Sequence, residues 1–514
     1  MSKQVFMICN AHLDPVWQWE WEEGAAEAIS TFKVAADFCE EYEGFIFNHN
    51  EALLYRWVEE YEPELFERIK VLVKKGRWHI MGGWYLQPDC NIPSGESFVR
   101  QILEGHKYFQ EKFGVVPQAA NSFDAFGHSR GLVQILAKSG YKGYIFCRPT
   151  GEVPGLPGDR FIWKGFDGSK IMGQRMPHMY ASGLGGAVDK IKGTMNAYPD
   201  NNIIPCLWGM GDHGGGPSRI DIESLNKLAA EMAPDAILKH STPEEFFEQV
   251  EKSGEELPEF EGELNPWGVG CYTSQIKLKQ KYRAVENQLY SVERMCSAAQ
   301  IAGVMAYPKS ELEEVQRDML MCQFHDILAG TSILPGEQGA LRTLDHGLEI
   351  LSKLRARAFF ALAASQRKAQ PDEIPILIYN PHPFEIEGDF ECEMMLWGGS
   401  FDEVFSMPQV YRDGEALPTQ PEKEQSNLSI DWRKRVVFHT TLAPMQLNRF
   451  DCKYTRLERK PAITSQEDNS YIYLEGGNTQ LRIDKNTGYI DSWLSEGRQY
   501  LSRPISLDII ADSA

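Results

Sequence analysis

Short apolar runs alternate with amphipathic stretches over the first 250 residues of the chain. The apolar runs are typical of buried strands, and the stretches between them have apolar positions three and four residues apart, as helices do. The predicted strands are VFMIC at 5–9, FIFN at 45–48, YIFC at 144–147 and IIPCLWG at 203–209, and the predicted helices are 26–42, 51–74, 95–113 and 221–232. Repeated strand and helix units of this length predict a parallel sheet covered by helices, either open or closed into a barrel.

The pattern changes twice after residue 250. A segment rich in Gly, Pro and Glu at 252–270 is typical of a boundary loop, and three long helical patterns follow it at 274–303, 309–329 and 337–367. From residue 374, short alternating strands continue to the final DIIADSA, and no closing element follows them. The chain is therefore predicted to contain an α/β domain, a three-helix bundle and part of a larger β domain, over 1–262, 263–370 and 371–514.

Composition and charge narrow the partners of this multidomain protein. The chain has 514 residues, and 52 Lys and Arg against 73 Asp and Glu give a formal net charge of −21. This acidic surplus repels phosphates and anionic headgroups, so it excludes nucleic acid and anionic membranes as partners. With 42% hydrophobic residues, the chain has enough apolar surface to build packed cores.

The N-terminal segment and the cysteines indicate the compartment. The apolar run in MSKQVFMICNAHLD is too short for a signal peptide, and no later stretch reaches the roughly 18 apolar residues that cross a bilayer. Ten cysteines without a CxxC pair are typical of reduced, buried thiols. We expect a cytoplasmic protein.

Two polar motifs directly follow predicted strands in the first half. In Asn-Ala-His-Leu-Asp-Pro-Val-Trp, His12 and Asp14 are two positions apart, so an extended backbone points both side chains to one side. Such a pair suits a zinc ligand set, although a hydrogen-bonded core histidine fits the same pattern. In Asn-Ser-Phe-Asp-Ala-Phe-Gly-His-Ser, Ser129 lies nearer to the following helix than Asp124 does. Ser129 is therefore the better cap, and Asp124 is available for chemistry.

Two further motifs combine histidine and aspartate. Asp212 precedes three glycines in Trp-Gly-Met-Gly-Asp-His-Gly-Gly-Gly-Pro. The loop lacks the Lys-Ser/Thr of a phosphate-binding loop. Two interpretations of the glycines remain: a flexible turn, or a loop whose backbone approaches a ligand closely. His325 and Asp326 end the second predicted bundle helix, where such a pair commonly complements the helix dipole. Combined with the first two motifs, His325 would complete a site of two histidines and two aspartates.

In this order and with these spacings, the four motifs resemble those of glycoside hydrolase family 38, the α-mannosidases. The Gly-Asp-x-Gly-Gly-Gly-Pro loop is most similar to the bacterial branch. The resemblance covers the whole chain. It implies a seven-stranded parallel β/α barrel-like catalytic domain, then a three-helix bundle and the start of a β-sandwich domain that is truncated here, because members of the branch usually run several hundred residues further. The family often forms dimers or tetramers, so a homo-oligomer is one expectation, and the oligomeric state stays open.

The resemblance implies roles for particular residues. It implies one zinc ion per chain, with ligands at His12, Asp14, Asp124 and His325, and it places the nucleophile at Asp124. Asp212 is the position that best matches the acid/base, in a loop that departs from the Gly-Asp/Ser-Asp-Phe sequence of much of the family. The positions that match substrate contacts in the family are Trp17, Phe126, Arg148 and Asp326.

Other segments supply further candidates for sugar contacts. Trp84 and Asp89, in MGGWYLQPDCN, follow another strand-like segment, and an aromatic ring beside a carboxylate is a common sugar-binding pair. A packed tryptophan and a turn aspartate fit the same sequence equally well. Tyr272 and Thr273 follow the boundary loop, where a domain junction can form a pocket.

The activity implied is hydrolysis of terminal non-reducing α-mannosyl residues, with a neutral mannose-containing glycan or mannoside as partner. Retaining glycosidases use two carboxyl groups about 5 Å apart, one as nucleophile and one as acid/base, and zinc can bind the sugar hydroxyls. A metal-dependent carbohydrate deacetylase or amidohydrolase would need similar ligands but no nucleophilic carboxylate. A non-catalytic sugar-binding protein is the third hypothesis. The linkage that is cleaved stays open.

Overall fold

The computed structural model describes residues 2–265, 267–461 and 465–507. These residues form two compact units, 1–365 and 366–514, and each is described by itself. The final DIIADSA, on which the expectation of an unfinished β domain partly rests, lies outside the described residues. Among the described helices, none combines the length and the apolar character needed to cross a bilayer.

Hydrogen bonding within the described α/β part gives two five-stranded sheets. The first is parallel and has the order β3-β2-β1-β8, with β9 also pairing with β1; its strands are β1 (Lys3–Asn10), β2 (Phe47–His49), β3 (Trp78–Ile80), β8 (Ile203–Trp208) and β9 (Ala236–His240). The second has the order β10-β6-β7-β5-β4; its strands are β4 (Ala119–Ser122), β5 (Gly143–Phe146), β6 (Arg160–Lys164), β7 (Lys170–Arg175) and β10 (Glu259–Phe260).

This pairing differs from the seven-stranded parallel barrel that was expected. The strands β6 and β7 run antiparallel, because only residues 165–169 separate them and so short a connection makes a hairpin rather than a parallel crossover. The described residues of the α/β part include two separate hydrophobic cores. One contains Trp84, Tyr144 and Trp163, and the other contains Phe6, Phe123 and Phe246.

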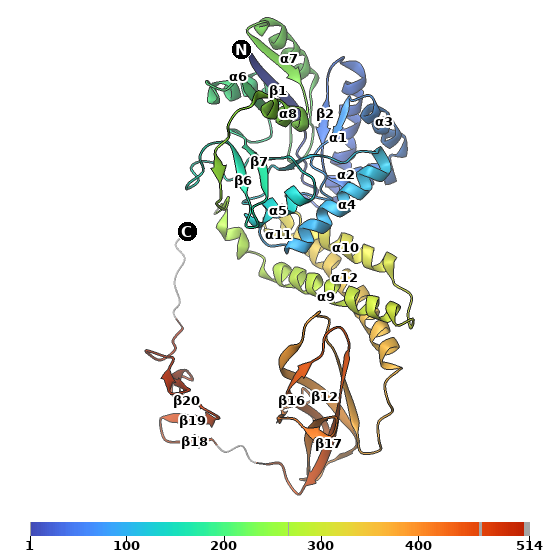
Figure 1. The fold of residues 1–514 in the computed structure, drawn as a ribbon, viewed down its shortest axis with the longest axis vertical. Helices are drawn as coiled ribbons and strands as arrows, with labels where there is room; N and C mark the ends of the chain where they lie inside the picture. The colour runs from blue at the N-terminus through green and yellow to red at the C-terminus, as the bar shows by residue number, and fades with distance from the viewer. Residues whose placement is uncertain (1, 266, 462–464, 508–514) are drawn as a thin grey trace. The chain divides into compact units, whose positions relative to one another are not determined.

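Helices surround these sheets (Figure 1). Their bounds are α1 (Trp21–Glu41), α2 (Ala52–Tyr61), α3 (Pro63–Lys74), α4 (Gly95–Phe113), α5 (Gly131–Lys138), α6 (Ala187–Ala197), α7 (Arg219–Met232) and α8 (Pro243–Ser253). The single helix expected at 51–74 is wrong: two helices meet at Pro63, which is the first residue of α3. Proline lacks the N–H that a helix interior needs but is well suited to a first position.

The ends of α4 are set by its sequence. The Ser94 Oγ accepts a hydrogen bond from the Ser97 backbone N–H at 3.3 Å, and Gly114 closes the helix with a positive φ of 72°. A serine cap and a left-handed glycine are preferred at these two positions. The helix therefore presents Ser97 and Gln101, both buried, toward the helical part of the chain.

Three long helices of the first unit lie side by side in Figure 1: α9 (Ile276–Ile301), α10 (Lys309–Cys322) and α12 (Leu334–Ala363). A 3-10 turn, η1 (Val269–Tyr272), precedes them, and the short α11 (His325–Leu328) separates α10 from α12. The bundle was expected, but α10 ends seven residues before the predicted 329. The reason is tertiary: the Asp89 N–H donates to the Gln323 carbonyl at 2.8 Å, and Phe324 pairs with Pro88.

The second unit is built from antiparallel strands in its described part. One sheet contains β11 (Ile374–Tyr379), β17 (Leu447–Leu457), β13 (Phe405–Arg412) and β14 (Glu415–Ala416), and another contains β12 (Ile386–Ser400), β16 (Asp431–Leu442) and β15 (Thr419–Glu422). Val410 and Phe450 of the first sheet share a core with Val436 and Phe438 of the second, as in a β-sandwich. A separate meander contains β18 (Gln466–Glu467), β19 (Tyr471–Gly476), β20 (Thr479–Asp484), β21 (Ile490–Ser495) and β22 (Arg498–Gln499).

Candidate functional site

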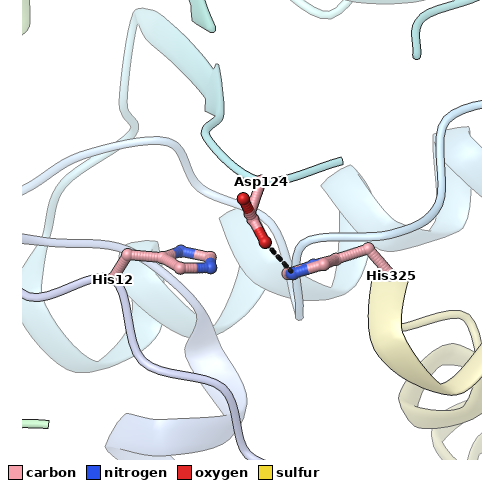
Figure 2. Close-up of side chains that lie close together, drawn as sticks. All are labelled: His12, Asp124 and His325. Carbon is pink, nitrogen blue, oxygen red and sulfur yellow. Dashed lines mark ion pairs between the residues drawn. The ribbon is translucent and has the colours of Figure 1, made fainter. Parts of the chain in front are cut away.

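Side chains from three parts of the first unit converge at one point. His12 and Asp14 follow β1, Asp124 follows β4, and His325 begins α11. Figure 2 shows His12, Asp124 and His325 pointing toward one another, with the Asp124 carboxylate between the two rings. The convergence needs the break after α10, because a continuous helix through residue 329 would place His325 mid-helix instead of at the start of α11.

The distances fit a metal-ligand group. The Asp14 Oδ1 lies 3.0 Å from the His12 Nε2 and 3.5 Å from the His325 Nε2, which is itself 3.8 Å from the Asp124 Oδ2. Two overlapping groups of ligand residues can be defined, and within each group the ligand atoms lie within 4.8 Å of one another. One group contains His12, Asp124 and His325, and the other contains Asp14, His325 and Asp326. The four ligands expected from the sequence are thus divided between two groups that share His325.

Unsatisfied atoms indicate what this cluster is built to hold. The His12 Nε2, the Asp14 Oδ1 and the His325 Nε2 are buried and, within the described residues, have no hydrogen bond of acceptable geometry. Buried polar atoms are costly unless a partner satisfies them. Imidazole nitrogens and carboxylate oxygens are the donors that a zinc-like cation prefers, so the residues present fit such an ion.

Opposite charges inside the cluster shift its pKa values. Burial alone would lower the pKa of His325, but the carboxylates of Asp326, Asp14 and Asp124 outweigh burial and raise it. Burial alone would raise the pKa of Asp14, yet the two histidines lower it to about 2. Burial raises the pKa of Asp326. A concentrated negative charge of this kind attracts a cation.

Asp124 has a second, oriented contact. Its Oδ1 accepts from the Arg148 Nε at 2.7 Å, and the Arg148 Nη2 lies at the same distance. Arg148 also lies over the Phe126 ring, 5.5 Å from the ring centroid. The expectation that Ser129 caps α5 is wrong, because the N-cap position is Arg130 and has no side-chain cap hydrogen bond; the Ser129 Oγ instead accepts from the Gly131 N–H at 3.2 Å. One oxygen of Asp124 is thus held by the arginine while the other faces His325.

Asp212 lies beside the cluster because its backbone is tied to the first motif. Its N–H donates to the His12 carbonyl at 2.7 Å, and its carbonyl accepts from the Asp14 N–H at 2.9 Å. The φ of Asp212 is +65°, a conformation that non-glycine residues rarely adopt. Its Oδ1 accepts from the Tyr180 hydroxyl at 2.6 Å, and Tyr180 packs against the His12 ring at 4.4 Å between centroids.

The glycines after Asp212 make a tight turn instead of a phosphate cradle. Met210 and Gly216 exchange two backbone hydrogen bonds of 2.8 and 2.9 Å, and the Gly215 N–H donates to the Thr31 Oγ1 at 2.8 Å. At Gly216, which has a φ of +62°, an added Cβ would lie 3.3 Å from Ala11. The loop therefore packs on the α1 side of the fold, and this packing fixes the position of Asp212.

The remaining residues that the sequence suggested as sugar contacts differ in their burial. Trp84 is fully buried in a hydrophobic core, and its Nε1–H donates to the Asn121 carbonyl at 2.7 Å. The expectation of a sugar contact there is corrected, because a ring with no exposed surface cannot stack on a sugar. Asp89 is also buried; its Oδ1 accepts from the Asn91 and Ile92 N–H groups, while its Oδ2 has no hydrogen-bond partner among the described residues.

The other candidates differ in exposure, and among them Asp326 is buried. Trp17 is half-buried and packs edge-on against Trp19, and Asp326 accepts from the Thr331 hydroxyl at 2.5 Å. The Tyr272 hydroxyl accepts from the Asn91 side chain at 2.6 Å, while Thr273 is exposed. The roles of these residues stay predictions.

Several buried polar residues beside the cluster were missed from the sequence. Gln87 contacts both histidines, Tyr180 holds Asp212, and Glu51 is fully buried with a φ of +73°. Burial raises the pKa of Glu51 to about 7. Glu51 follows β2 as His12 follows β1, so its place after a strand was the one signal that could have found it. Tyr180 lies in an irregular segment without such a signal, and Gln87 lies in the MGGWYLQPDCN segment after β3, where the sequence singled out Trp84 and Asp89 instead.

Two family models match the chain. The model for the glycosyl hydrolases family 38 N-terminal domain matches residues 2–267, and that for the alpha mannosidase middle domain matches residues 269–362. The first therefore covers the sheets with the first two ligand motifs, and the second covers the helices with His325.

Individual proteins agree with these matches. Alpha-mannosidase G of Dictyostelium discoideum is 32% identical over 64% of this chain and 30% of its own length, and mouse alpha-mannosidase 2C1 is 29% identical over 96% and 44%. This chain spans less than half the length of either relative. The crystal structure of an alpha-mannosidase from Enterococcus faecalis V583 has a TM-score of 0.75 at 19% identity, covering 95% of this chain and 61% of that one, and so shares the fold. Because the N-terminal family model matches more than half of the residues, the chain belongs to glycosyl hydrolase family 38.

Proposed function

We propose that this chain carries the catalytic site of a zinc-dependent retaining α-mannosidase that hydrolyses terminal non-reducing α-mannosyl residues of mannose-containing glycans or mannosides. The strongest support is the convergence of His12, Asp124 and His325, with the other oxygen of Asp124 held by Arg148. A structural metal site would need no arginine beside a ligand. Membership of family 38 and the names of the relatives support the same activity.

Zinc would be held by His12, Asp14, Asp124 and His325. When bound, the ion supplies a positive charge that binds sugar hydroxyl oxygens and stabilises the distorted ring of the transition state. Two histidines and two aspartates would complete a tetrahedral zinc site, so binding of sugar oxygens would require coordination beyond four. Asp326, which shares a ligand group with Asp14 and His325, is placed to accept a hydrogen bond from a sugar hydroxyl.

Protein side chains perform the bond-making and bond-breaking steps. Asp124 attacks the anomeric carbon and forms a glycosyl ester, while Arg148 holds its carboxylate in place. Asp212 first donates a proton to the leaving oxygen and then takes one from the water that attacks the ester. Trp17 and Phe126, both half-buried, offer ring faces to the apolar side of the sugar.

A panel of linkage-defined mannobioses and an aryl α-mannoside tests the proposal on the full-length protein. Activity should fall on treatment with a chelator and return with added zinc. Steady activity in chelator would remove the metal from the mechanism. Release of acetate from acetylated sugars, with no mannose released from any substrate, would instead support a deacetylase that uses a metal-activated water.

A further inference from the structure

Gln87, which the sequence did not single out, contacts His12, His325 and the residue that precedes Asp124. It lies between β3 and α4 and is fully buried. Its backbone carbonyl accepts from the His325 N–H at 3.3 Å and faces the His325 Nδ1 at 3.4 Å. Its side-chain Oε1 accepts from the Phe123 N–H at 2.7 Å, and its Nε2 lies 3.3 Å from the His12 Nδ1.

We propose that Gln87 is a positioning residue that holds His325 through its backbone carbonyl and the nucleophile segment through its side chain, so that removing the side chain weakens metal binding although no ligand is lost. The inference rests on the zinc site of the proposed function. It concerns a residue that itself contributes no atom to either candidate ligand group.

The contact with His325 leaves the metal-facing nitrogen of that ring available. In the neutral form of the ring, a histidine whose Nδ1–H donates to a carbonyl carries no proton on Nε2, and Nε2 can then bind a metal. In this structure the His325 Nε2 is buried and unsatisfied within the described residues. The position of the Gln87 carbonyl in turn depends on the Gln87 N–H, which donates to the buried Glu51 carboxylate at 3.3 Å.

The side chain of Gln87 faces His12 and the segment that carries Asp124. Phe123 immediately precedes Asp124, so the 2.7 Å bond from its N–H to the Gln87 Oε1 holds the strand end that carries the nucleophile. Because that N–H requires an acceptor, the amide nitrogen must face His12. The amide nitrogen only donates, so it suits a His12 with an unprotonated Nδ1 and opposes the Nδ1–H of a His12 that binds a metal through Nε2. The support that this side chain gives to the metal site therefore runs through Phe123.

Glutamate at position 87 would keep the bond to the Phe123 N–H and replace the donor that faces His12 with an acceptor. Both carboxylate oxygens accept hydrogen bonds, so one can accept from the Phe123 N–H while the other accepts the Nδ1 proton of a metal-bound His12. Carboxylates often take this place behind a metal-ligating histidine. Gln87→Glu should therefore bind zinc at least as tightly as the parent, whereas Gln87→Ala should not.

Gln101 provides a matched control. It is fully buried, its Oε1 accepts from the Leu86 N–H at 3.0 Å, and its Nε2 donates to the Leu320 carbonyl at 2.9 Å. Gln101→Ala therefore removes a buried amide that supports the same segment, but among the described residues this amide makes no hydrogen bond to His12, His325 or Phe123. A general loosening of the segment would affect both alanine variants alike.

The experiment measures zinc affinity of the metal-free full chain by competition with a chromophoric chelator, and unfolding midpoints in urea for each variant. We expect Gln87→Ala to bind zinc about 10- to 100-fold more weakly than the parent, with Gln87→Glu and Gln101→Ala no more than about threefold weaker. Parent-like affinity of Gln87→Ala, or equal losses in Gln87→Ala and either Gln87→Glu or Gln101→Ala, would overturn the inference alone. Absence of saturable zinc binding by the parent would overturn the proposed metal site as well.

Discussion

At the scale of single residues, the backbone of Asp212 is the most unusual feature of the site. A left-handed conformation in a non-glycine residue costs on the order of 1 kcal/mol, and here the hydrogen bonds to His12 and Asp14 hold it in place. Such a conformation persists only where the surrounding structure enforces it. The side chain of Asp212 is thereby presented next to the ligand cluster, as the proposed acid/base requires.

This placement leads to a prediction for Asp212→Ala. Loss of a general acid affects substrates with poor leaving groups most, because activated aryl groups need little protonation. The kcat/KM for a natural mannobiose should fall at least about 100-fold further than that for an activated aryl α-mannoside. Asp189→Ala, at an exposed position of α6, is the control. Equal losses on both substrates would show that Asp212 is not the acid.

Sequence motifs predicted the residues that follow strands and missed those between elements. His12, Asp14 and Asp124 were found because strand ends are recognisable as apolar runs that stop at polar residues. Tyr180 and Gln87 belong to irregular segments, where no periodicity indicates which way a side chain points. Trp84 was assigned wrongly for the same reason, since one tryptophan in a loop fits a core as well as a sugar-binding surface.

At the scale of elements, the position of His325 depends on how the long helices attach to the α/β part. Glu286 of α9 is almost fully buried and accepts hydrogen bonds from the Ser97 hydroxyl at 2.5 Å and the Ser94 N–H at 2.9 Å, both at the start of α4. The Tyr282 hydroxyl donates to the same oxygen at 2.9 Å. This carboxylate therefore joins the two helices.

Removing that carboxylate should destabilise the first unit. In Glu286→Ala several buried donors lose their acceptor, and each unsatisfied donor costs roughly 1–3 kcal/mol, so we expect a loss of about 3 kcal/mol in urea denaturation. Glu349→Ala on α12 removes an exposed pair with Lys353 and should change stability by less than about 0.5 kcal/mol. A Glu286→Ala protein as stable as the Glu349→Ala control would contradict the assignment of this carboxylate.

A second set of contacts between elements is sensitive to pH. Glu244 of α8 accepts from the Gln118 and Ala119 N–H groups and lies 2.6 Å from the His79 Nε2. Burial alone would raise the pKa of Glu244, but His79 lowers it below the usual 4.5. The stabilisation is therefore present above about pH 4.5 and is lost as pH falls through the lowered folded pKa. The urea midpoint of Glu244→Gln should lie below that of the parent at pH 6 and approach it at pH 3.5; an unchanged gap would refute this.

Among the elements, local patterns predicted most helices and strands but not their tertiary interruptions. The helix expected at 51–74 divides at Pro63, a signal that the sequence does contain. The helix expected at 309–329 ends at Cys322 because Gln323 and Phe324 pair with the segment at 88–89. That pairing joins residues more than 230 positions apart, so no local pattern could reveal it. The same break produces α11 and thus positions His325.

At the scale of the whole molecule, all candidate ligands lie within the first compact unit, residues 1–365. A truncated protein of residues 1–365 should therefore bind about one zinc ion per chain with an affinity within about tenfold of the 514-residue chain. Metal content by mass spectrometry after gel filtration checks this. A folded 1–365 protein that retains no zinc would mean that the second unit is required for the site.

The central claim is that Asp124 forms a covalent bond to the sugar, and a fluorinated mannosyl fluoride that traps this ester tests it most directly. After inactivation of the full-length protein and proteolysis, mass spectrometry should find one adduct, on the peptide that contains Asp124, and excess mannoside should protect against labelling. Labelling of a different carboxylate, or turnover of α-mannosides by a protein that never becomes labelled, would contradict the account.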